Sequence, residues 1–112
     1  MRKSLAVLFL LLAISSYAAQ RQFVLFEVGT GTWCGFCPAA SAIIDQMYAE
    51  GYQIAISELH GDDSYECVDG QARMQTLGIS AFPTIIPDGG AEPSYPYSYE
   101  ILVNTVTQRL TV

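Results

Sequence analysis

Two cysteines separated by two residues lie between an apolar run and a helical pattern, and this arrangement constrains the fold more than any other feature. The apolar run is Phe23–Val28, and Cys34 and Cys37 follow a glycine- and threonine-rich loop. The first turn of a helix brings two cysteines at this spacing close enough to form and break a disulfide. Backbone N–H groups at a helix N-terminus favour negative charge, so we expect Cys34, as the more exposed thiol, to ionise more readily than a free cysteine.

The rest of the chain continues this alternation of strands and helices. The first apolar run is continuous, which is typical of a central strand covered on both faces, and the run at 52–59 suggests a second buried strand. Pro93 and Pro96 would limit the last strand to an edge position. The expected strands are at 23–28, 52–59, 84–86 and within 91–97, and the expected helices are at 37–50, 65–77 and 98–110.

The N-terminal 18 residues have the layout of a secretory signal peptide. Arg2 and Lys3 precede an apolar run over residues 5–14, and small residues suit cleavage after Ala18. This run is shorter than the roughly 20 residues that are needed to span a bilayer, so a permanent membrane anchor is not expected. We therefore predict an exported protein, periplasmic or secreted, from which residues 1–18 are removed.

Residues 19–112 are long enough for one small domain with one core. They contain three arginines, no lysine and eleven acidic residues, which gives a formal net charge of −8. Nucleic acids and anionic membrane surfaces are therefore poor partners on charge alone. We expect a monomer, because a domain of this length leaves no room for a dimerisation module.

Two separate segments resemble the thioredoxin superfamily. Trp33–Cys37 (Trp-Cys-Gly-Phe-Cys) resembles the active-site motif, and Gly78–Thr84 resembles the loop that carries the family's cis-proline. The resemblance implies an α/β minimal thioredoxin fold of order β-α-β-α-β-β-α, with a four-stranded mixed central sheet flanked by helices. It also implies a thiol:disulfide oxidoreductase whose redox group is the Cys34–Cys37 disulfide, with no metal and no further cofactor.

The resemblance assigns different roles to the two cysteines. Cys34 would form a mixed disulfide with a client protein, and Cys37, deeper in the helix, would resolve it. The residues themselves leave two other interpretations open. The pair could be half of a zinc site, for which Cys67 and His60 are the only other soft ligands, or it could be an inert structural bridge.

Glu27 is the acidic residue that the sequence singles out. A carboxylate inside a buried strand is costly without a partner, and such burial favours its protonated form. We therefore predict that Glu27 accepts the proton of Cys37. The family's buried acid is usually an aspartate six residues before the first cysteine, whereas Glu27 lies seven before Cys34, so that Gly31 would be an insertion. The alternative is that Glu27 faces solvent at a sheet edge.

Trp33, Phe82 and Pro83 are the expected substrate-binding residues. The resemblance places Trp33 beside the dithiol, where it would screen the sulfurs from bulk water; the alternative is plain core packing. It also places a cis Pro83 against the dithiol, so that the backbone of Phe82 can pair with an extended client segment. The alternative there is a trans proline in an ordinary turn.

Two further residues have simpler predictions. Cys67 is expected in the core because it shares a helical face with Met74 and Leu77, and the alternative is a reactive or dimer-forming thiol. His60 is expected to be a loop histidine.

The function predicted from these features is an exported thiol:disulfide oxidoreductase that acts on protein thiols and disulfides. Disulfides persist outside the cytosol, so a dithiol there either works in the oxidising direction or needs a membrane or envelope partner to keep it reduced. The alternative function is a thioredoxin-fold binding module, in which the disulfide only locks the loop and the Phe82–Pro83 edge holds a partner.

Overall fold

The computed structural model describes residues 19–90 and 97–111. The signal peptide predicted at residues 1–18 lies outside these ranges. Within them, no helix is both long enough and apolar enough to span a bilayer. The elements are, in chain order, β1 (Val24–Thr30), α2 (Cys37–Ala49), β2 (Ile54–His60), α3 (Val68–Leu77), β3 (Thr84–Pro87) and α4 (Tyr99–Arg109).

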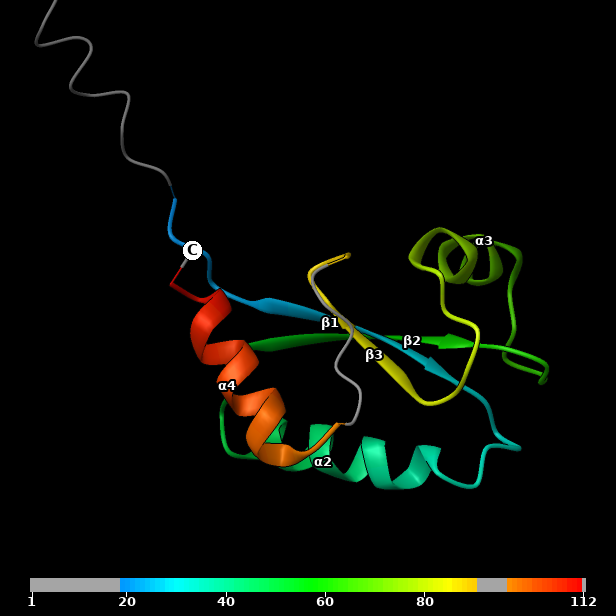
Figure 1. Cartoon of the computed structure of the whole chain (residues 1–112), viewed down its shortest axis with the longest axis horizontal. Helices are drawn as coiled ribbons and strands as arrows, with labels where there is room; N and C mark the ends of the chain where they lie inside the picture. The colour runs from blue at the N-terminus through cyan, green and yellow to red at the C-terminus, as the bar shows by residue number, and fades with distance from the viewer. Residues whose placement is uncertain (1–18, 91–96, 112) are drawn as a thin grey trace, which may run out of the picture.

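The described strands form one mixed sheet with β1 in the middle, in the order β2-β1-β3 (Figure 1). β1 runs parallel to β2 and antiparallel to β3, and the register pairs Thr30 with His60 and Glu27 with Ile86. The mixed sheet was predicted, but the described residues contain three strands rather than four. The fourth strand, predicted within 91–97, falls outside the described residues except for Tyr97, which is not in a strand.

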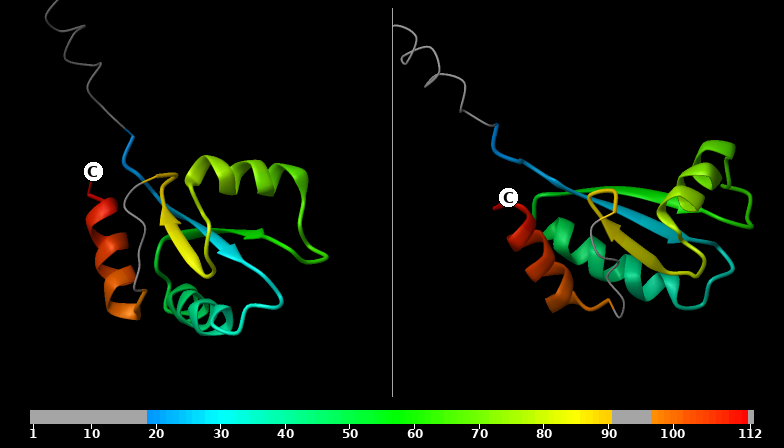
Figure 2. Two further views of the ribbon diagram at one scale, coloured as in Figure 1. Left: turned by 45° about the vertical axis from the view of Figure 1, so that its right-hand side comes forward. Right: turned by 45° about the horizontal axis from the view of Figure 1, so that its top comes forward.

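Helices cover both faces of this sheet. α2 and α4 lie against one face and α3 lies against the other (Figures 1 and 2). Side chains alternate between the faces of a strand, so β1 directs one set toward α2 and α4 and the other, including Glu27, toward α3. The core between the sheet, α2 and α4 consists of Val24, Phe26, Val28, Ala40, Ile44, Met47, Ile54, Ile85, Leu102 and Val106.

The second strand is less buried than predicted. Ile54 and Leu59 are buried, but Ile56 is 40% exposed. β1 has a neighbouring strand on each side, whereas β2 forms an edge of the described sheet. The apolar run at 52–59 therefore predicted the strand correctly, but the prediction that this strand is buried was wrong for part of its length.

Local signals place the helix ends well. Gly78 ends α3 in the left-handed conformation at φ 69°, and the Ser98 side chain accepts a hydrogen bond from the N–H of Ile101 at the start of α4. The start of α3 differs from the prediction, because the helix begins at Val68 rather than at residue 65. Cys67 precedes it in extended backbone.

Candidate active site

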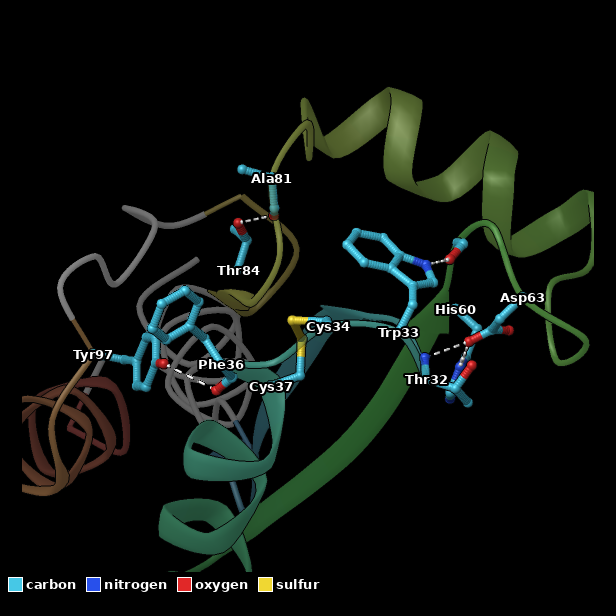
Figure 3. The surroundings of a disulfide bond; sticks show 11 residues. Thr32, Trp33, Cys34, Phe36, Cys37, His60, Asp63, Ala81, Thr84 and Tyr97 are labelled. Atoms are coloured by element: carbon cyan, nitrogen blue, oxygen red, sulfur yellow. Dashed lines mark hydrogen bonds and ion pairs between the residues drawn. A yellow bond between two sulfur atoms is a disulfide. The ribbon is translucent and has the colours of Figure 1, made fainter.

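Cys34 and Cys37 form a disulfide where the loop after β1 enters α2, with their Cα atoms 5.4 Å apart (Figure 3). Both residues are buried in this form, with exposed fractions of 6% for Cys34 and 4% for Cys37. Exposure therefore does not separate their roles. Their positions in the chain differ, because Cys37 is the first residue of α2 and Cys34 lies in the loop before it.

The N-terminus of α2 is open to a negative charge. Its N-cap residue is Phe36, which makes no capping hydrogen bond with its side chain, and the first turn contains no acidic residue. Pro38 occupies the first turn, where its missing N–H costs little. The unpaired N–H groups and the helix dipole can stabilise a thiolate on the adjacent cysteine once the disulfide is reduced.

Trp33 lies at the surface beside the disulfide, with Phe36 on the other side (Figure 3). The exposed fractions are 58% for Trp33 and 76% for Phe36, so core packing of Trp33 is ruled out. The indole Nε1–H donates a hydrogen bond of 2.9 Å to the carbonyl oxygen of Gly61. The indole also contacts Phe82, with ring centroids 5.7 Å apart, and both residues line a cavity of about 240 Å³.

The loop before β3 is held against the ends of the two parallel strands. Its Phe82–Pro83 peptide bond is cis, and Pro83 is buried. The Phe82 ring packs directly on two glycines: a Cβ on Gly29 would lie 3.0 Å from the ring, and one on Gly61 would lie 2.8 Å from it. Phe82 therefore occupies space that glycine leaves free next to the active-site loop.

Glu27 is buried as predicted, at 5% exposure, but it is not unpaired. Its two carboxylate oxygens accept hydrogen bonds from Arg73 of α3, at 2.6 Å from Nε and 2.8 Å from Nη2. The hydrogen bond to Glu27 raises the pKa of the Arg73 guanidinium. The pair lies on the face of the sheet that α3 covers, whereas α2, which carries Cys37, covers the other face. A position at a solvent-facing sheet edge, the alternative for Glu27, is also wrong.

A histidine and an aspartate that sequence reasoning did not assign to the site lie next to it. His60 is the last residue of β2, not a loop residue, and its Nδ1 is 2.7 Å from Oδ2 of Asp63. The same oxygen accepts a hydrogen bond of 2.8 Å from the N–H of Thr32, two residues before Cys34 (Figure 3). The His60 hydrogen bond, helped by the N–H groups of Thr32 and Tyr65 and opposed by burial, lowers the pKa of Asp63 to about 2.

Cys67 was predicted in the core and is instead exposed. It is the N-cap of α3, where its Sγ accepts a hydrogen bond of 3.3 Å from the N–H of Gly70. Helical spacing did not apply to it because the residue precedes the helix. The part of the chain that the structure describes contains no cluster of three or more His, Cys, Asp or Glu side chains that could hold a metal ion.

Comparison with known proteins shows similarity at the level of structure. No protein-family model matches the sequence, and no curated protein matches it. The structure of HBP35 of Porphyromonas gingivalis is similar with a TM-score of 0.64 and 24% identity, covering 81% of this chain and 33% of that one. The chain thus spans about a third of that protein's structure.

Two thioredoxins are similar over most of their length. Thioredoxin O2 from Arabidopsis thaliana has a TM-score of 0.59 and 19% identity, covering 78% of this chain and 75% of its own. A mutant thioredoxin from Halobacterium salinarum has a TM-score of 0.58 and 20% identity, covering 80% of this chain and 76% of its own. The described residues therefore form a thioredoxin-like fold, with the Cys34–Cys37 disulfide at the N-terminus of its α2 helix.

Proposed function

We propose that the protein is a thiol:disulfide oxidoreductase that exchanges the Cys34–Cys37 disulfide with cysteines of client proteins. The main support is the position of this disulfide at a helix N-terminus without a side-chain cap, in a thioredoxin-like fold. Such a position favours the thiolate, which is the form of cysteine that attacks a disulfide.

The exchange takes two steps. The Cys34 thiolate attacks a client disulfide, so that a Cys34–client disulfide forms and one client sulfur leaves as a thiolate. Cys37 then attacks the Cys34 sulfur, the second client sulfur leaves, and the client is reduced while the Cys34–Cys37 pair is oxidised. The reverse sequence oxidises a client dithiol. Glu27 was predicted from the sequence to accept the proton of Cys37, but this role has a rival in His60, because the Glu27 carboxylate is paired with Arg73 of α3.

Client binding is proposed for the surface around Trp33, Phe82 and Pro83. Trp33 and Phe36 present exposed aromatic surface on either side of the disulfide, and Trp33 and Phe82 line the cavity of about 240 Å³. We expect an extended client segment with an apolar side chain near its cysteine, paired through the main chain at Phe82–Pro83. Replacing Trp33 with alanine should weaken client binding more than it slows reaction with a small disulfide.

We also propose that the protein is exported, to the periplasm or the cell exterior, after removal of residues 1–18. A redox partner in the membrane or envelope would set the direction of electron flow. The protein would act as a monomer on protein substrates and would not bind nucleic acid. Cell fractionation and the N-terminal sequence of the purified protein test the location and the cleavage after Ala18.

The alternative is a binding module with a redox-inert disulfide, and the burial of both cysteines favours it. To separate the two functions, the protein is equilibrated in glutathione buffers and its thiols are trapped by alkylation. A midpoint within the range of thioredoxin-like proteins, about −270 to −120 mV, supports exchange. A disulfide that resists reduction below about −300 mV would be structural and would end the proposal.

A second experiment looks for clients directly. The Cys37→Ala variant retains the attacking cysteine and cannot resolve the mixed disulfide, so it should accumulate client adducts in an exporting cell. The Cys34→Ala/Cys37→Ala variant is the matched control, because it keeps Cys67 and should accumulate none through the active site. Equal adduct levels in both variants would count against catalysis by Cys34.

A further inference from the structure

β2 ends in two titratable side chains on the face of the sheet that α2 covers. Ile54 at the start of β2 belongs to the core on that face, and side chains alternate along a strand, so Glu58 and His60 extend from the same face. They lie at the end of β2 beyond the core. A cavity of about 210 Å³ there is lined by both Glu58 and His60 and by both cysteines, Cys34 and Cys37.

His60 is oriented by its neighbour Asp63. A carboxylate only accepts hydrogen bonds, so the imidazole Nδ1, 2.7 Å from Oδ2 of Asp63, carries a proton and donates it. In the neutral imidazole this leaves Nε2 as a proton acceptor. Nε2 lies 3.8 Å from Oε2 of Glu58, which is longer than a hydrogen bond, so Glu58 does not occupy this acceptor. Thr32 and Tyr65 fix the carboxylate through their N–H groups.

The other acidic candidate is placed differently. Glu27 lies on the sheet face covered by α3, and both of its carboxylate oxygens are engaged by Arg73. The Asp63 carboxylate, in contrast, connects His60 to the active-site loop through Thr32.

We propose that His60 accepts the proton of the Cys37 thiol when the mixed disulfide is resolved, with Asp63 as its positioning residue. This role depends on the exchange function proposed above. The proton passes from Cys37 to Nε2 through the solvent of the shared cavity, and the Cys37 sulfur bonds to the Cys34 sulfur. The bond between Cys34 and the client sulfur breaks, and the client sulfur leaves with the electron pair and takes a proton from the imidazolium. One client cysteine is thereby reduced, and the Cys34–Cys37 pair is oxidised.

The test follows the reaction of the reduced protein with Ellman's reagent in a Cys67→Ser background. Cys34 attacks first and releases one thionitrobenzoate, and Cys37 then resolves the adduct and releases a second. His60→Asn keeps an amide donor toward Asp63 and removes the acceptor at Nε2. We expect it to slow the second release about tenfold or more at pH 7, in line with general-base contributions of roughly 10²–10⁴, and to change the first release less than twofold.

The pH profile distinguishes proton transfer from a structural effect. The groups that face His60 are Glu58, Asp63, the Tyr65 ring at a centroid distance of 5.2 Å, and the two cysteines. The rate of the second release should be slower in His60→Asn than in its Cys67→Ser parent at pH 7, and this difference in rate should disappear above about pH 9.5, where a thiol ionises without help. A difference that persists there would overturn the proposal.

Further variants cover the other outcomes. Asp45→Asn, an exposed carboxylate of α2, should leave both releases unchanged. If His60→Asn does not fold, Asp63→Asn is measured instead. This variant should slow the second release at least threefold, and an unchanged rate of the second release would refute the role of the His60–Asp63 pair.

Two results would overturn different parts of the argument. A slower second release in Glu27→Gln, with a normal one in His60→Asn, would assign the proton to Glu27. A disulfide that glutathione buffers cannot reduce would overturn the exchange function itself, whereas normal exchange with an unaffected second release in His60→Asn overturns only the role of His60.

Discussion

Reducing the disulfide should destabilise the folded protein by a small and calculable amount. Cys34 and Cys37 are three positions apart, so the bond closes a loop of only four residues. The chain-entropy model then gives a stabilisation of about 2 kcal/mol at 25 °C. For a domain of this size, the loss corresponds to a fall in Tm of roughly 8–16 °C.

This difference should narrow as the pH rises. In the reduced protein the N-terminus of α2 can stabilise a Cys34 thiolate, which is worth about 0.3–2 kcal/mol. The folded protein then releases this proton at a lower pH than the unfolded chain, so the reduced protein gains stability with rising pH, and the gain is complete above about pH 8.5. We expect a gap of about 2 kcal/mol at pH 5 and of about 0–1.7 kcal/mol at pH 9.

Guanidinium unfolding of the oxidised and reduced protein at both pH values measures this gap. The Cys34→Ser/Cys37→Ser variant serves as the control, because its stability should not respond to the reductant. A gap above about 4 kcal/mol would mean that the disulfide does more than close a short loop. A gap that is the same at pH 5 and pH 9 would show that the helix N-terminus does not stabilise the thiolate.

Three further predictions concern residues around the site and in the core. The hydrogen bond from His60 lowers the pKa of Asp63 to about 2, so the contribution of this carboxylate to stability is complete above about pH 4 and is lost as the pH falls toward 2. In Asp63→Asn the free energy of unfolding, measured with urea, should depend less on pH in this window. An unchanged dependence on pH would contradict this prediction. Leu102→Ala removes a fully buried side chain and should lower the free energy of unfolding by about 2–5 kcal/mol, whereas a loss below 1 kcal/mol would argue against the packing of α4. Gly61→Ala would place a Cβ 2.8 Å from the Phe82 ring, so it should displace the ring and change the fluorescence of the single tryptophan; an unchanged spectrum would refute the contact.

Features that depend on neighbours in the chain were predicted well from the sequence. The helix from Cys37, the end of α3 at Gly78 and the cap of α4 at Ser98 all follow from local spacing and backbone preferences. The failure at Cys67 has the same origin, because a helix pattern extended by three residues placed an exposed N-cap in the core.

Features that depend on distant segments were not predicted. Glu27 was expected to be unpaired, but its partner Arg73 is 46 residues away and reaches it only because α3 packs on that face of the sheet. His60 was expected in a loop because glycine and two aspartates follow it, yet it pairs with Thr30 at the end of β2. Both corrections depend on contacts between segments that lie far apart in the chain.

The amino-acid sequence alone determined the order of the described strands and helices and the position of the cysteine pair at a helix start, because period, capping and turn chemistry act within a few residues. The tertiary structure decided which groups meet at that pair. The parallel pairing of β1 with β2 places His60 and Glu58 at the cavity that the two cysteines also line. On the other face of the sheet, the packing of α3 brings Arg73 into contact with Glu27. Such contacts depend on strand order and register, which join segments far apart in the chain and leave no local pattern.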